Sequence, residues 1–181
     1  MSNYSGDKAF KRLILKGKTI AYIDWANVHG WKKTLKREVD SVKLFSYLKT
    51  YAEIIDTRLY FGEDAHPKSA QFLKQTQKIG YTVVSKPVKC VPIEGLDGKK
   101  LNRRKCDFDM EVCIDVHKAL NEGVMSFIFF TGDGDYEPLY KMLIDLCKQV
   151  IVVYTAGHLG REIWNIKRGL FKAQLKNLMD I

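Results

Sequence analysis

The chain has 181 residues, of which 46% are hydrophobic and 28% are charged. This length suits one domain, spanning residues 1–181, that folds without disulfides or a structural metal. No stretch approaches the roughly 20 apolar residues that cross a membrane, and the N-terminus lacks the apolar core of a signal peptide. The four cysteines form no C-x-x-C pair, as expected in a reducing compartment. We therefore expect a cytoplasmic protein with no membrane partner, with its core at about 19–178 and a basic extension at 1–18.

A formal net charge of +9 makes a polyanion the expected partner. The basic residues gather in three clusters, at 8–18, 31–37 and 97–105. Lysine and arginine release counterions from phosphates and attract nucleic acid to the surface. The side chains expected to contact nucleic acid are Lys32, Lys33, Lys99, Lys100, Arg103, Arg104 and Lys105.

Apolar runs rich in β-branched and aromatic residues alternate with helical patterns along the chain. The runs at 19–24, 57–62, 81–88, 126–132 and 150–155 predict strands. The intervening patterns predict helices at 41–54, 66–79, 107–123, 135–149 and 159–179, and the stretch 85–105 is expected to be a loop. This alternation is typical of an α/β fold, a Rossmann-like three-layer sandwich with a mainly parallel sheet.

Aspartates follow two of the predicted strands. Asp24 closes the first strand, and Asp133 and Asp135 follow the fourth. Open α/β sheets bind ligands at the carboxyl ends of their strands, at the point where the strand order reverses. Asp109 adds a fourth carboxylate, because at 100° per residue it is in phase with the apolar stripe of its helix.

Such clustered carboxylates repel one another, by about 4 kcal/mol per pair at 4 Å and an effective dielectric constant near 20. They must take up protons, pair with basic residues or bind a cation. An all-oxygen ligand set suits Mg²⁺ or Mn²⁺, which can orient a phosphodiester and activate a water molecule.

Each of these residues also has a structural alternative. Asp135 stands where a helix N-cap is expected, so capping and ligation are both open to it, and Asp107 can cap the helix that follows it. Asn27 can shape the turn after the first strand, or hold Asp24, or touch phosphate. Asp115 lies near the edge of the apolar stripe of its helix.

Three segments together resemble the NYN domain family, whose LabA-like members belong to the PIN-like nuclease superfamily. They are YIDWANV at the first strand, KCDFDMEVCIDVHKAL on a helix and FFTGDGDYEPLYKML after the fourth strand. The likeness covers about residues 19–178, in the family's order and spacing. The resemblance implies a PIN-like sheet of order 3-2-1-4-5 and metal-dependent cleavage of RNA.

Carried over position by position, the resemblance implies that the catalytic and metal-binding residues are Asp24, Asp109, Asp133 and Asp135, with the signature Asn27 beside them. We expect Asp115, Thr131 and Asp107 to support these residues from a second layer of the site. We therefore expect an endoribonuclease that uses Mg²⁺ or Mn²⁺ on RNA, or on another single-stranded nucleic acid. The alternatives are a nucleic-acid-binding or regulatory module that does not cut, and a phosphatase or nucleotide hydrolase. The oligomeric state is open, with a homodimer among the alternatives.

Overall fold

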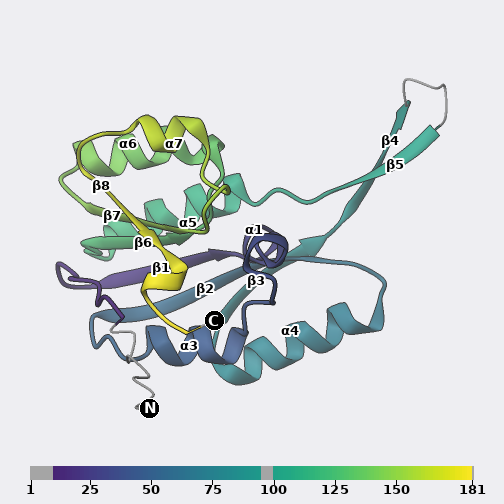
Figure 1. The fold of residues 1–181 in the computed structure, drawn as a ribbon, viewed down its shortest axis with the longest axis horizontal. Coiled ribbons are helices and arrows are strands. Elements are labelled where there is room, and N and C mark those ends of the chain that lie inside the picture. The colour runs from purple at the N-terminus through teal and green to yellow at the C-terminus, as the bar shows by residue number, and fades with distance from the viewer. Residues whose placement is uncertain (1–9, 95–99, 181) are drawn as a thin grey trace, which may run out of the picture.

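The computed structural model describes the backbone of residues 10–94 and 100–180, and the side chains of these residues apart from 93–104. Six parallel strands form its main sheet in the order β3-β2-β1-β6-β7-β8 (Figure 1). The first five of these strands along the chain follow the order 3-2-1-4-5, so the predicted topology is confirmed. The strands are β1 (Thr19–Asp24), β2 (Ile54–Glu63), β3 (Thr82–Pro87), β6 (Ser126–Phe130), β7 (Gln149–Tyr154) and β8 (Leu170–Gln174).

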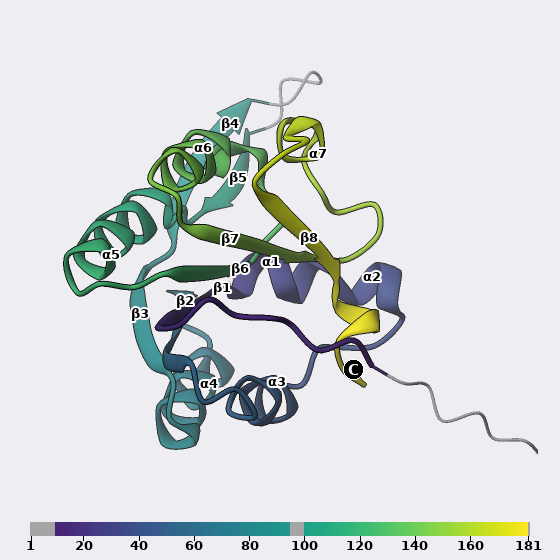
Figure 2. The ribbon, with the colours of Figure 1, turned by 90° about the vertical axis from the view of Figure 1, so that its left-hand side faces the viewer.

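Helices cover both faces of the sheet, as Figure 2 shows for the pairs α3 and α4, and α5 and α6. Alternate residues of β1 point into two separate cores because side chains in a strand alternate between faces. Ala21 and Ile23 belong to the core under α1, α3 and α4, whereas Ile20 and Tyr22 belong to the core under α5 and α6. The predicted three-layer sandwich is therefore confirmed. The helices are α1 (Trp25–Gly30), α2 (Lys32–Leu35), α3 (Ser41–Leu48), α4 (Pro67–Ile79), α5 (Asp109–Asn121), α6 (Glu137–Asp145) and α7 (Arg161–Asn165).

Local sequence signals set several helix ends. The Asp40 carboxylate caps α3 by accepting hydrogen bonds from the amides of Val42 and Lys43, at 2.7 and 3.2 Å. Pro67 begins α4, and Gly80 ends it in the left-handed conformation with a φ of 116°. These boundaries agree with the sequence-based expectation.

The expected loop at 85–105 contains a β-hairpin. Its strands β4 (Lys89–Glu94) and β5 (Lys100–Lys105) pair antiparallel, with Lys89 opposite Lys105 and Glu94 opposite Lys100. The hairpin projects from the body of the domain (Figure 1). The prolines and glycines of this stretch favour a loop prediction, but proline is tolerated in a strand whose outer edge is unpaired.

The prediction of one long helix at 159–179 is wrong. The chain forms α7, then strand β8, then the short 3₁₀ helix η2 (Leu175–Asn177). Helix α7 ends at Asn165, Gly169 has a φ of 79° just before β8, and the residues after it pair with β7 from Val150 opposite Leu170 onward. Backbone pairing with a fully buried neighbouring strand thus overrides the local helical pattern.

The described part of the N-terminal extension, residues 10–18, packs on the domain. The Lys16 amide donates to Ser126 Oγ and Gln149 Oε1, each at 3.0 Å, and the Lys11 amide donates to the Asn177 carbonyl at 2.8 Å. Across residues 10–94 and 100–180, no helix has the length and apolar character needed to cross a membrane.

Candidate active site

Asp24 ends β1 and caps the helix that follows. Its Oδ1 accepts a hydrogen bond from the Asn27 amide at 3.1 Å. Burial raises the pKa of the Asp24 carboxyl to about 6, the hydrogen bond from Asn27 opposes this shift, and the carboxylates of Asp133 and Asp109 add to it. The local environment therefore disfavours a bare negative charge on Asp24.

The chain after β6 forms a tight acidic turn beside the end of β1. Asp133 caps the 3₁₀ helix η1 (Gly134–Tyr136) because its Oδ1 accepts from the Asp135 amide at 3.1 Å. The amide of Asp133 in turn donates to the hydroxyl of buried Thr131 at 3.2 Å. The sequence predicts Asp135 as a candidate N-cap of the helix that contains Pro138, but the N-cap of α6 is Tyr136, without a side-chain cap hydrogen bond, and Asp135 is exposed.

Asn27 joins the two strand ends. Its Oδ1 accepts a hydrogen bond from the Gly132 amide at 3.2 Å, across β1 and β6, which are paired in parallel up to Ile23 and Phe130. The sheet order reverses between these two strands, because β2 and β7 lie on opposite sides of them. The acids of both strands therefore lie at the predicted switch point.

Asp109 reaches the same edge from the first turn of α5. Its carboxylate accepts a hydrogen bond from the hydroxyl of buried Tyr136. Burial raises the pKa of Asp109, the Tyr136 hydrogen bond opposes the shift, and the charges of Asp133, Asp107 and Asp135 add to it. The four acids of the predicted site thus share one electrostatic environment.

The two acids that were predicted to support the site, Asp107 and Asp115, make ion pairs of their own. Asp107 is exposed and pairs with Lys105 at 2.9 Å. Asp115 lies further along α5 and pairs with Arg58 Nη1 at 3.3 Å, and it also accepts from the Tyr60 hydroxyl at 2.8 Å. Asp115 therefore ties α5 to β2 and does not share the turn that carries Asp133.

A loop after β7 closes over the acidic turn. The Gly160 amide donates to the Gly132 carbonyl at 2.6 Å, and a Cβ added to Gly132 would collide with the backbone carbonyl of His158. A Cβ on Gly134 would collide with the carboxylate of Glu162, in the first turn of α7. Glu162 is not among the residues predicted from the sequence, although its place beyond the carboxyl end of β7 is a usable signal.

Only some of the basic residues predicted to contact nucleic acid have side chains among the described residues. Lys32 Nζ pairs with Glu38 at 3.4 Å and contacts His29 Nε2 at 3.2 Å, whereas Lys33 is exposed. Lys105 is exposed at the root of the hairpin. The backbone of β5 carries Lys100, Arg103 and Arg104, whose side chains lie outside the described residues, as does the whole of Lys99.

The carboxylate oxygens of the acidic site are suitable ligands for a hard cation. The acidic side chains, however, are not already arranged around a single ion position. All the acidic donors are carboxylate oxygens, the ligands that Mg²⁺ and Mn²⁺ prefer. Within the described residues, no three His, Cys, Asp or Glu side chains are already placed to hold a metal ion together. One carboxylate oxygen each of Asp24 and Asp133 is engaged by a backbone amide, which leaves further lone pairs for a ligand.

The family model of the NYN domain matches residues 18–166, from the start of β1 to the end of α7. The chain belongs to the NYN domain family. This family falls within the PIN-like nuclease superfamily, so membership supports a role on nucleic acid. The resemblance found in the sequence is thereby confirmed.

Two known proteins extend the comparison for this NYN domain. It is 29% identical over 115 residues to the low amplitude and bright protein LabA of Synechococcus elongatus. That match covers 62% of this chain and 59% of LabA. A crystal structure of a protein of unknown function from Vibrio parahaemolyticus matches with a TM-score of 0.69 at 21% identity, covering 93% of this chain and 100% of the other. The second likeness supports the fold alone.

Proposed function

We propose that this NYN domain is a divalent-metal-dependent endoribonuclease that hydrolyses phosphodiester bonds of single-stranded RNA. The observation that carries the proposal is the Asp24 carboxyl, buried at the switch point of the sheet with a pKa raised to about 6 beside Asp109 and Asp133. A raised carboxyl pKa at the carboxyl edge of a parallel sheet is typical of a functional site.

In this proposal the ion is held by Asp24, Asp109 and Asp133, with Asp135 at the open side of the site. Bound Mg²⁺ or Mn²⁺ supplies a water molecule of lowered pKa and neutralises charge that develops on the phosphate. A cation would also offset the desolvation of the charged Asp24 and Asp109 carboxylates and their repulsion by Asp133. Because no three acids are already drawn together, ion binding would require side-chain rotations.

The other residues of the site position the acids and the strand. Asn27 fixes the end of β1 against the turn after β6, and the Tyr136 hydroxyl holds Asp109. The basic residues of β5, Lys105 among them, would attract the phosphates of the nucleic-acid strand toward Asp109, which follows them closely in the chain. Lys33 would add to this attraction from α2.

One observation favours a second candidate function. The described acids are not in place to hold a metal ion together. A regulatory module that binds nucleic acid with the same basic surface, and does not cut it, is consistent with that geometry. The two candidates differ in one measurable outcome, which is strand cleavage.

The test is an assay of a fluorescently labelled single-stranded RNA with Mn²⁺, with Mg²⁺ and with EDTA. It compares the wild type with Asp24→Asn, Asp133→Asn and the matched control Asp145→Asn, which removes an exposed carboxylate at the far end of α6. We expect cleavage that EDTA abolishes and that each site variant lowers by about 100-fold or more, equivalent to about 3 kcal/mol of lost transition-state stabilisation.

The control should cleave like the wild type. Cleavage that survives both site substitutions would overturn the proposed site. RNA binding without any metal-dependent cleavage by the wild type would favour the regulatory module.

A further inference from the structure

A groove of about 660 Å³ lies beside the acidic site. The first residues of α1, the end of β2, the start of α4 and the root of the hairpin form its walls. Trp25, which follows Asp24 directly, lines the groove, and the charge of Asp24 acts on Cys106 in the groove lining, so the groove lies close to the acidic site. Its volume falls within the roughly 300–1,000 Å³ that is usual for ligand sites.

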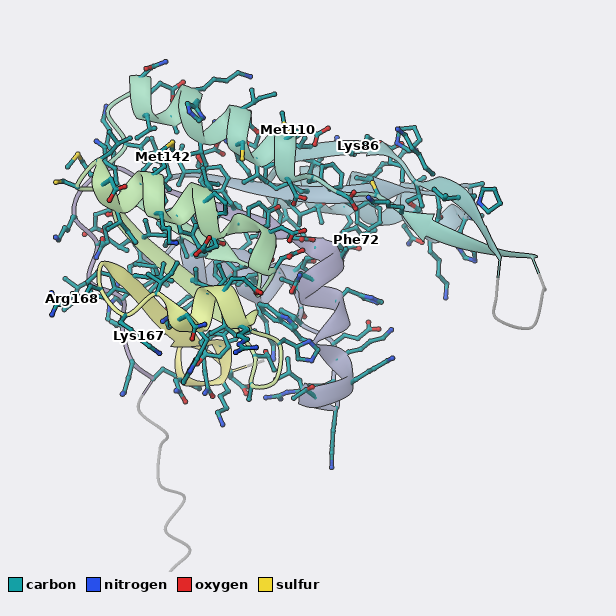
Figure 3. All side chains as sticks on the ribbon, turned by 90° about the horizontal axis from the view of Figure 1, so that it is seen from above. Phe72, Lys86, Met110, Met142, Lys167 and Arg168 are labelled. Atoms are coloured by element: carbon teal, nitrogen blue, oxygen red, sulfur yellow. The ribbon has the colours of Figure 1, made fainter. Side chains whose placement is uncertain are left out.

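Three aromatic side chains line this groove. The Phe72 ring lies 4.9 Å from the Trp25 ring and 4.9 Å from the Phe61 ring, measured between centroids. Trp25 is buried at 8% exposure, whereas Phe61 and Phe72 are half-buried and also pack against the core. Figure 3 places Phe72 near the end of the body from which the hairpin leaves. The exposed parts of Phe61 and Phe72 therefore offer flat apolar surface inside the groove.

Polar groups stand next to this aromatic surface. His66 Nδ1 accepts a hydrogen bond from the Lys68 amide at 3.2 Å, which assigns the proton of the neutral ring to Nε2. Ser69 Oγ accepts from the Asp64 amide at 3.1 Å. His66, Ser69 and Lys68 all line the groove. An apolar platform with hydrogen-bonding groups at its edge matches the chemistry of a nucleobase better than that of an aliphatic ligand.

We propose that this groove binds a base of the nucleic-acid strand, stacked on Phe72 and Phe61, when a neighbouring phosphate of the same strand lies at the acidic site. This inference rests on the proposed function, because it takes the strand to pass Asp24. Stacking on an aromatic side chain is sequence-tolerant, since every base has a flat face. The groove would thus select single-stranded over duplex substrate, whose bases are stacked on one another.

The test is the affinity of a fluorescein-labelled oligoadenylate, measured by anisotropy in EDTA so that the strand stays intact. Phe72→Leu keeps an apolar side chain and removes the flat ring. The matched control is Phe171→Leu, which removes an exposed ring on β8, outside this groove. A strand with abasic positions serves as the second probe, and thermal unfolding shows that both variants are folded.

We expect Phe72→Leu to weaken oligoadenylate binding by about 5- to 100-fold, as for one lost base stack, while Phe171→Leu binds like the wild type. The effect of Phe72→Leu should shrink on the abasic strand. Equal binding by the two variants, or an equal loss on both strands, would overturn the base site. Absence of binding by the wild type would overturn it as well.

Cleavage in Mn²⁺ is measured separately and distinguishes the two proposals. A wild type that cleaves, together with a Phe72→Leu variant that binds normally, would contradict the proposed base site and support the proposed nuclease activity. A wild type that binds through Phe72 and never cleaves would contradict the proposed nuclease activity and support the proposed base site.

Discussion

The side chain of Asn27 and the backbone of Gly132 join the two strands that carry the acidic site. Asn27 Oδ1 accepts from the Gly132 amide at 3.2 Å, and the Asn27 amide donates to Asp24 at 3.1 Å. One residue therefore contacts Asp24 directly and contacts Asp133 through the neighbouring residue. The spacing of the two acids depends on this bridge.

Asn27→Ala should loosen the bridge, because the Gly132 amide loses its acceptor. We expect the free energy of unfolding to fall by about 1–2 kcal/mol, the usual cost of a lost partner for a partly buried donor. Urea unfolding followed by circular dichroism measures this change. Asn27→Asp keeps an acceptor at the same position and should recover part of the hydrogen bond, although it adds a charge. A stability unchanged in Asn27→Ala would mean that water replaces the side chain.

Gly132→Ala should destabilise the domain strongly. A Cβ at this position would collide with the backbone carbonyl of His158, which cannot move without displacing the loop that binds Gly132 through Gly160. We expect a loss of about 1–3 kcal/mol or more in unfolding free energy, as for overpacked sites.

The matched control for that change is Gly30→Ala. Gly30 lies in α1, and nothing lies within 4 Å of its added Cβ, so stability should stay the same or rise by up to about 1 kcal/mol. Equal thermal midpoints for the two variants would show that the loop after β7 does not rest on the acidic turn as described.

The acids of the site could be placed from sequence because each one follows a strong local pattern. Asp24 ends a strand whose other residues are all buried, and Asp109 is in phase with the buried residues of its helix. Parallel pairing then brings the carboxyl ends of the strands to one edge of the sheet, regardless of the loop conformations. The order of the sheet was expected from the resemblance to the NYN domain family and not from these local patterns.

Features that depend on loop geometry could not be predicted in this way. Asp133 caps η1 because a 3₁₀ turn precedes α6, and no local signal distinguishes this from a cap at Asp135. Glu162 lies against Gly134 because the loop after β7 packs on the acidic turn, where the Gly160 amide donates to the Gly132 carbonyl. The contact of Phe61 with Phe72 brings together β2 and α4, which no periodic pattern encodes.

Asp24→Asn should stabilise the metal-free domain at neutral and alkaline pH. The pKa of Asp24 is raised from 3.8 to about 6, so the folded state binds the proton more tightly than the unfolded state does. Ionisation of Asp24 therefore lowers stability as pH rises through about 6. We expect the variant to be more stable than the wild type by up to about 3 kcal/mol at about pH 8, and the difference to vanish by about pH 4.

Urea titrations of both proteins in EDTA across this pH range measure the difference. Asparagine keeps an oxygen acceptor for the Asn27 amide, so the comparison isolates the charge. A variant that is less stable than the wild type at every pH would contradict the assigned electrostatics. Adding Mn²⁺ should reverse the order, because only the wild type keeps the charged ligand.

Tyr136→Phe should change the pH dependence of RNA cleavage. The Tyr136 hydroxyl donates to Asp109 and lowers the pKa of that carboxyl against the opposing effect of burial. Its removal should raise the pKa of Asp109, so the acid side of the pH–rate profile should move to higher pH. The free energy of unfolding should fall by about 1 kcal/mol.

Tyr81→Phe is the matched control, because it also removes a buried hydroxyl, one that donates to the Ser41 carbonyl at 2.7 Å away from the acids. It should lose similar stability and keep the wild-type pH profile. A profile that Tyr136→Phe leaves in place would contradict a need for the Asp109 charge in the rate-limiting step, and one that moves to lower pH would contradict the assigned hydrogen bond. A positioning role for Tyr136 therefore depends on the direction of this shift and not on the loss of activity alone.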